Sequence, residues 1–108
     1  MELLERFARG DREAFETLFR EHQREVYGWC MRVVRERGAA EDLTAEAFFK
    51  MYRAHARFDP QRSFGAWARR IATNLALDHL RKSRRETALV DEPAGVAGME
   101  FWRRDLRW

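Results

Sequence analysis

The feature that most constrains the fold is an amphipathic segment that runs without interruption from Ser63 to Arg85. Ser63 follows a Pro-containing loop, residues 57–62, and a serine in that position is typical of a helix N-cap. Apolar side chains then return every three or four residues, the repeat of a helix with one buried face; they are Phe64, Trp67, Ala68, Ile71, Ala72 and Leu75. The segment predicts one long helix that packs along a single face.

The remainder of the chain also predicts helices. Only two prolines interrupt it, Pro60 and Pro93, and no stretch alternates apolar and polar residues for long. This pattern favours an all-α fold, a compact bundle of about four helices. We expect the helices that precede the loop at about residues 1–9, at 12–37 with Asp11 as N-cap and Gly38 as C-cap, and at about 40–56 with Leu43, Ala47, Phe48, Met51 and Tyr52 buried.

Length and composition predict one domain followed by a tail. A chain of 108 residues can bury a core without disulfides or metals. We place the helical domain at residues 1–85 and a flexible linker and tail at 86–108, where small residues, Pro93 and two glycines break the pattern. Within the tail, residues 99–108 could form a short amphipathic helix that folds back on the core or docks on a partner.

The sequence also predicts a cytoplasmic protein without membrane insertion. Its one cysteine, Cys30, cannot form an intramolecular disulfide, which suits a reducing compartment. No apolar run approaches the ~20 residues that a membrane span requires, and the first fifteen residues lack the apolar centre of a signal peptide.

Residues that could carry catalysis are scattered. His22, His55 and His79 fall on different predicted helices, with no cysteine or acid at metal-ligand spacing. His22 lies on an apolar face and Cys30 lies between Trp29 and Met31, so we interpret both as core residues. Glycine-rich phosphate loops and nucleophile elbows are missing. The sequence therefore predicts a protein that is not an enzyme and has no catalytic residue, metal or cofactor.

Positive charge is concentrated in one segment. Residues 57–85 hold eight Lys or Arg against two acids, a net charge of +6, whereas residues 1–56 carry −1 and residues 86–108 carry −2. Such a concentration indicates a polyanionic partner, above all nucleic acid. Phe58, Phe64 and Trp67 alternate with arginines, which suits stacking on unpaired bases. The alternative is a solvated basic helix. Phe64 and Trp67 could equally belong to the core, and for Trp67 that is the better explanation.

A second candidate surface lies on the helix at 40–56. Asp42, Glu46, Phe49 and Arg53 follow one another at i, i+4, i+7 and i+11, so they form a stripe separate from the buried one. We call these four residues the acidic stripe. An aromatic residue among acids has no core role there and indicates a partner. A solvated face with one exposed Phe explains the pattern equally well.

Three motifs in this order resemble region 2 of bacterial sigma factors of the extracytoplasmic-function group. They are AEDLTAEAF at residues 40–48, FDP at 58–60, and FGAW at 64–67 followed by IATNLALD at 71–78. The resemblance covers about Gly10 to Arg85. In this family the helix with the acidic motif docks on the clamp helices of the RNA polymerase beta-prime subunit, which implies that role for Asp42, Glu46 and Phe49, with Arg53 at the edge. Many relatives have Gln where this chain has Ala45, so one hydrogen bond is expected to be missing.

The resemblance also implies a DNA site. In the family, the loop and the helix after it bind the non-template strand of the minus-ten promoter element as it melts, and the loop pockets one flipped base. The residues implied are Phe58, Asp59, Gln61, Arg62 and Ser63 in the loop, and Arg69, Arg70, Thr73, Asn74, Asp78, Arg81, Lys82, Arg84 and Arg85 in the helix. Arg81 and the last three are flexible charges that suit phosphates. Arg70 and Ile71 stand where housekeeping relatives have a tryptophan wedge, which implies weaker melting and a stricter demand on sequence.

The resemblance further implies control by an anti-sigma factor and a second helical domain, region 4. The 23 residues after Arg85 are too few for that domain, so we expect either an excised domain or a natural short form. Two other classes of function remain open from the residues. One is a general basic module for single-stranded nucleic acid, and the other is a helical protein-interaction adaptor whose basic face is only solvated.

Overall fold

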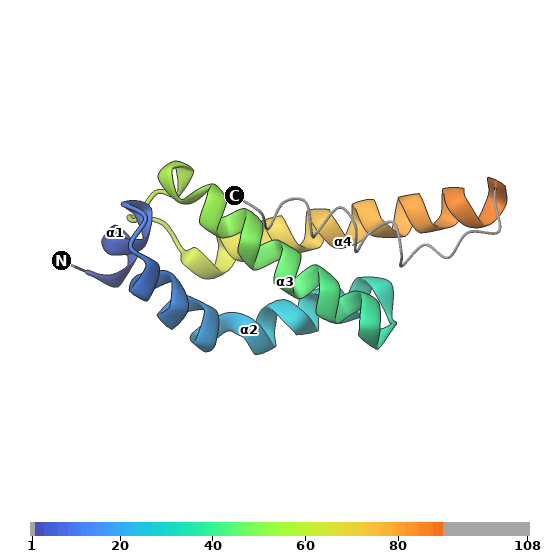
Figure 1. Ribbon diagram of the computed structural model, residues 1–108, viewed down its shortest axis with the longest axis horizontal. Coiled ribbons are helices and arrows are strands. Elements are labelled where there is room, and N and C mark those ends of the chain that lie inside the picture. Colours follow the sequence, from blue (N-terminus) through green and yellow to red (C-terminus); the bar gives the residue numbers. More distant parts are fainter. Residues whose placement is uncertain (1, 90–108) are drawn as a thin grey trace.

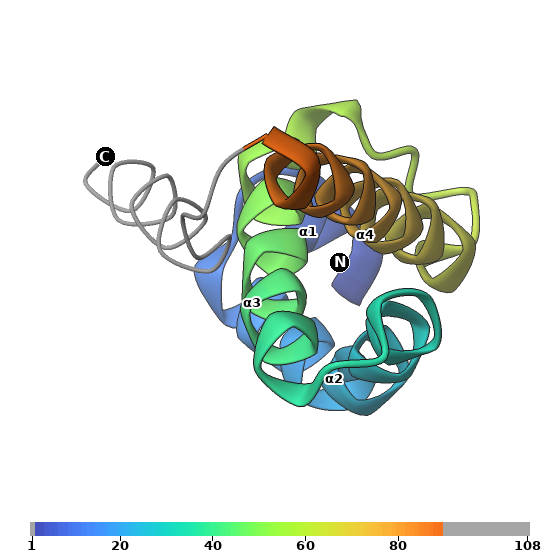
Figure 2. The same cartoon turned by 90° about the vertical axis from the view of Figure 1, so that its right-hand side faces the viewer.

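The computed structural model describes residues 2–89, which form four α-helices and one 3-10 turn. The order is α1 (Leu3–Ala8), α2 (Arg12–Val34), α3 (Arg37–Arg53), the 3-10 turn η1 (His55–Arg57) and α4 (Phe64–Leu89). In Figure 1, α2 and α3 run antiparallel to each other, and α4 continues well past the end of both. Figure 2 looks along the long axis and shows α2, α3 and α4 arranged around a common centre. The predicted all-α bundle is confirmed.

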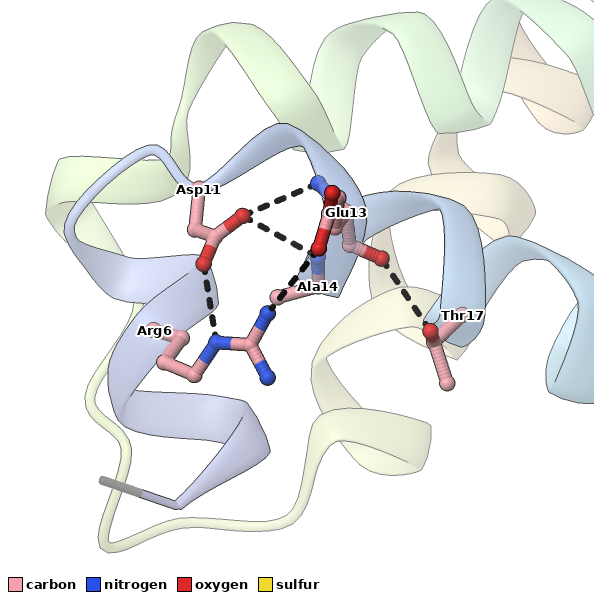
Figure 3. A network of polar contacts seen from close by, with 5 residues as sticks. All are labelled: Arg6, Asp11, Glu13, Ala14 and Thr17. Atoms are coloured by element: carbon pink, nitrogen blue, oxygen red, sulfur yellow. Dashed lines mark hydrogen bonds and ion pairs between the residues drawn. The ribbon is translucent and has the colours of Figure 1, made fainter.

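The start of α2 is fixed by a side-chain cap, as predicted. One carboxylate oxygen of Asp11 accepts hydrogen bonds from the backbone N–H groups of Glu13 (2.9 Å) and Ala14 (3.4 Å). The other accepts from Nε of Arg6 on α1 at 2.8 Å, and the guanidinium of Arg6 also lies 3.9 Å from the carboxylate of Glu13 (Figure 3). Asp11 therefore caps α2 and ties it to α1 at the same time.

The prediction that Gly38 ends α2 is wrong. The helix ends at Val34, and Arg35 adopts the left-handed conformation (φ 54°) that closes it. Glu36 then caps α3, because its carboxylate accepts from the N–H groups of Gly38 (2.8 Å) and Ala39 (2.7 Å). Gly38 thus lies in the first turn of α3. The connection between α2 and α3 therefore lies at residues 35–36, three residues earlier than the glycine suggests.

Two further boundaries differ from those predicted. The third helix ends at Arg53, and η1 follows it. Residues 86–89, predicted as the start of the linker, continue α4 to Leu89. Their sequence contains Glu, Ala and Leu, which favour helix, and no Gly or Pro. The predicted amphipathic segment at 99–108 lies outside the described residues.

The core is built from one face of every α-helix. Side chains of α4 enter it on the predicted face: Phe64, Ala68 and Ala72 are buried, and Trp67, Ile71 and Leu75 pack against them. Ala76 extends the buried row by one more turn. Across residues 2–86 no charged or polar side chain is buried. None of the helices described is long and apolar enough to cross a lipid bilayer.

The Asp11 cap predicts a pH dependence. The hydrogen bond from Arg6 lowers the pKa of Asp11, and the N–H groups of Ala14 and Glu13 lower it further. A carboxyl whose pKa is lower in the folded state stabilises the fold above its unfolded pKa of about 3.9, and this contribution disappears as the pH falls through the folded pKa. Asn can still cap a helix but carries no charge. We therefore expect Asp11→Asn to lower Tm at neutral pH, and the difference from wild type to shrink below about pH 4. A difference that stays constant to about pH 2 would contradict this assignment.

Candidate nucleic-acid and partner interfaces

The predicted DNA-reading loop is a closed turn between two buried phenylalanines. The carbonyl of Asp59 accepts from the N–H of Arg62 at 2.9 Å, and the carboxylate of Asp59 accepts from the N–H of Gln61 at 2.9 Å. Pro60 occupies the second position of this turn, where its fixed φ is favourable. The guanidinium of Arg62 lies 3.6 Å from the Asp59 carboxylate. The turn is therefore held in shape by its own bonds, and it leaves the side chains of Gln61 and Arg62 exposed.

Ser63 joins this turn to α4. Its hydroxyl oxygen accepts from the N–H of Ala66 at 3.1 Å, which confirms the predicted N-cap. The side chain of Ser63 is exposed as well. We call residues 59–62 the reading turn, after the role that the sequence predicts for them. Ser63 alone separates this turn from the first residue of α4, Phe64.

Phe58 and Phe64 cannot stack on bases as the alternation with arginines suggested. Both rings are only 4% exposed, and their centroids lie 5.7 Å apart. Each rests on the ring of Phe7, and Trp67 completes the group with its centroid 4.9 Å from that of Phe58. We call Phe7, Phe58, Phe64 and Trp67 the aromatic cluster. It forms the floor under the turn, and the core position expected for Trp67 is confirmed.

The predicted helix residues of the DNA site divide between two sides of α4. Arg70, Asn74 and Arg81 are exposed on one stripe, with Thr73 half-buried beside it. Leu77 lies on the same stripe and is the exposed large hydrophobic residue of the described chain, at 38%. Asp78 forms an ion pair with Arg81 at 3.2 Å. Lys82, Arg84 and Arg85 are exposed farther along, where α4 extends past the bundle (Figure 1).

Arg69 lies apart from this stripe. Its guanidinium carbon is 5.9 Å from the ring centroid of Trp29 on α2, within cation–π range. Adjacent helical residues point about 100° apart, so Arg69 lies on the side of α4 toward α2 and Arg70 does not, although both side chains are exposed.

The acidic stripe on α3 lies off the core, as predicted from spacing. Asp42 and Arg53 are exposed, and Glu46 and Phe49 are half-buried. Phe49 does not belong to the buried core or to the side chains that pack against it within residues 2–86. The guanidinium of Arg53 lies over the Phe49 ring at 5.8 Å from the centroid.

A groove of about 470 Å³ between α2 and α3 escaped the sequence analysis. Its lining comes from both helices: Phe19, Gln23, Arg24 and Tyr27 of α2, with Glu41, Thr44 and Ala45 of α3. Glu41 and Ala45 directly precede Asp42 and Glu46, so the groove runs alongside the acidic stripe. The sequence signal for this groove was the partly polar edge of the apolar face of α2. Spacing alone assigns that face to the core.

Two of the three histidines considered for catalysis have structural partners. The Nδ1 atoms of His22 and His55 donate to the carbonyls of Leu18 (3.0 Å) and Ala8 (2.9 Å). Cys30 is fully buried, and burial raises the pKa of its thiol, which disfavours the reactive thiolate. Among the residues that the structure describes, no three His, Cys, Asp or Glu side chains gather closely enough to hold a metal ion.

Comparison with known proteins matches residues 18–86 to Sigma-70 region 2. The ECF RNA polymerase sigma factor SigW of Bacillus subtilis is 35% identical over 94 residues, which cover 87% of this chain and 50% of that protein. The RNA polymerase sigma-H factor of Pseudomonas aeruginosa is 40% identical over 79 residues, 73% of this chain and 41% of that protein. The chain thus spans half or less of the length of these curated relatives.

A solved structure agrees with this match. An engineered region 2 of sigmaE, studied by NMR in complex with GTAAAA, superposes with a TM-score of 0.72 at 39% sequence identity. The superposition covers 78% of this chain and 87% of that one. Together with the helical order and the capped turn before α4, these matches establish that the chain belongs to the Sigma-70 region 2 family.

Proposed function

We propose that this chain is the domain of an extracytoplasmic-function sigma factor that docks on the RNA polymerase beta-prime clamp and recognises and helps melt the minus-ten promoter element. The observation that carries the proposal is a rigid, exposed turn that leads directly into a basic helix. The related region 2 of the same fold was solved in complex with the oligonucleotide GTAAAA. In this role the protein is a non-enzymatic initiation factor that acts in the cytoplasm.

The turn and the helix divide the work of binding DNA. Gln61 offers both a donor and an acceptor to a base edge, while Arg62 and the N–H groups of the first turn of α4 add donors. Because the Asp59 carboxylate already holds the turn, its contribution is to shape the site. The exposed cations at the far end of α4 contact phosphates, which strengthen binding without reading sequence.

The α4 stripe favours capture of an already open strand over forceful melting. Of the two residues that match the tryptophan wedge of housekeeping relatives, Arg70 is exposed and Ile71 packs against the core. A single flexible arginine offers no flat apolar surface to replace base stacking. Much of the sequence specificity therefore comes from recognition of the one base of the bound strand that enters the turn.

The acidic stripe and the adjacent groove form the proposed polymerase surface. Exposed Asp42 and half-buried Phe49, on one stripe of α3, suit a partner helix that brings basic and apolar side chains. The groove can accept apolar side chains of the same partner. An anti-sigma factor that covered either this surface or the turn would keep the domain from promoters.

Replacement of Gln61 tests the reading turn. The wild-type chain should first select a preferred hexanucleotide from a random single-stranded pool. Gln61→Ala should then relax the preference at one position by about 1–3 kcal/mol, because a base-edge contact is lost, and should leave Tm unchanged. Affinities for all single-base variants of the selected sequence provide the measurement. Gln23→Ala, at an exposed position of α2, is the matched control. An identical profile for Gln61→Ala and wild type would remove Gln61 from the site.

A double substitution tests the phosphate contacts. Lys82→Ala with Arg85→Ala should weaken binding to all hexanucleotides alike, because phosphates carry no sequence information. The slope of log K against log salt should flatten by about 0.7 for each lost contact. Arg12→Ala with Arg20→Ala removes the same charge from exposed positions of α2 and should change the slope little. Altered base preference at an unchanged slope would contradict this division of roles.

The polymerase surface is tested by Asp42→Lys combined with Phe49→Ala. We expect binding to core RNA polymerase to weaken by at least about 2 kcal/mol, as at other interface hot spots. Helicity should persist because neither residue belongs to the core. Glu21→Lys with Leu77→Ala makes the same charge change and truncates an apolar side chain outside the core, yet should bind as wild type. Equal affinity of both double variants would place the polymerase surface elsewhere.

A further inference from the structure

Helix α1 supplies the ring on which both ends of the reading turn rest. The side chain of Phe7 is fully buried (0% exposed). Its ring centroid lies 5.7 Å from that of Phe58, directly before the turn, and 5.6 Å from that of Phe64, directly after it. The ring of Trp67, one turn farther along α4, is 5.9 Å away. One side chain thus connects the two anchors of the turn to the start of α4.

The position of Phe7 is itself fixed by contacts at the end of α1. Nδ1 of His55, in η1, donates to the carbonyl of Ala8 at 2.9 Å. Arg6 forms the ion pair with Asp11 described above. Gly10 turns the chain at φ 91°, and a Cβ atom there would lie 3.0 Å from the imidazole of His55. Helix α1 is therefore attached to α2 and to η1, the segment that leads into the turn.

The hydrogen bonds of the turn fix its shape but not its place. They join residues 59, 61 and 62 to one another, and none of residues 59–63 belongs to the core: Pro60 is half-buried and the other four are exposed. The position of the turn relative to α4 depends on how Phe58 and Phe64 pack in the core. Both rings pack against Phe7, so a smaller side chain at residue 7 would leave a cavity next to both.

We propose that Phe7 is a positioning residue for base recognition, a role that rests on the proposed function of the turn. Selective contacts with a base edge require their donors and acceptors to stay within about 0.5 Å of the productive geometry. If Phe58 and Phe64 packed less tightly, the turn could shift, and the difference in affinity between bases would decrease. The phosphate contacts far along α4 tolerate such shifts. The residues matched to the family, 18–86, leave out α1 and Phe7.

The test compares two buried phenylalanines. Phe7→Leu removes the ring beneath the turn. Phe48→Leu makes the same change at a side chain that is 2% exposed and packs its ring against Phe15 and Phe19 of α2. Both variants should lose Tm. Discrimination between the selected hexanucleotide and its single-base variants, on the order of tenfold in wild type, should drop to about twofold for Phe7→Leu and stay near the wild-type ratio for Phe48→Leu. The salt slope should be unchanged in both.

If Phe7→Leu does not fold, a second variant tests the role of Phe7. His55→Phe retains a ring in that position but removes the hydrogen bond to Ala8, so it should also reduce discrimination. The inference is overturned if the folded variants among these two discriminate as well as wild type, or if Phe48→Leu loses discrimination equally. A wild-type chain that selects no sequence from the pool would instead overturn the proposed function itself.

Discussion

The arrangement of this domain depends on the close packing of α4 against the other helices along a row of small residues. Ala68, Ala72 and Ala76 follow one another at intervals of one turn and are fully buried. Small side chains at the contact let helices approach closely, whereas longer ones would hold them apart. No charged group is buried in residues 2–86, and the arginines of α4 are all exposed. One helix therefore serves as core on one face and as a cationic surface on the other.

The corner between α2 and α3 positions the proposed polymerase surface, which consists of the acidic stripe and the adjacent groove. Arg35 and Glu36 reverse the chain within two residues, one in a left-handed conformation and the other as a cap. The backbone N–H groups of Ala39 and Gly38 lower the pKa of Glu36, so the capping carboxylate stays ionised at neutral pH. The short connection keeps the helices antiparallel and in contact, and it aligns the groove with the acidic stripe.

Rigidity and charge are separated along the proposed DNA surface. The turn at residues 59–62 is closed by its own hydrogen bonds, so little conformational entropy remains to be lost when a base binds. The cations beyond Arg81 lie where α4 extends past the bundle (Figure 1) and need no fixed geometry to attract phosphates. Support for the rigid part comes from far away in the sequence, through Phe7 and the aromatic cluster.

The sequence by itself determined the helices, the caps at Asp11 and Ser63, the buried face of α4 and the location of the positive charge. These properties are local, because they depend on residues within one or two helical turns of each other. Only the tertiary structure decided that Phe58 and Phe64 form a floor, that Arg69 faces Trp29 while Arg70 faces solvent, and that Glu36 begins α3 ahead of Gly38. An aromatic residue between arginines suits a base and a core equally well. Phe58 and Phe64 lie in the core because both contact the ring of Phe7, which is more than fifty residues earlier in the chain than Phe64.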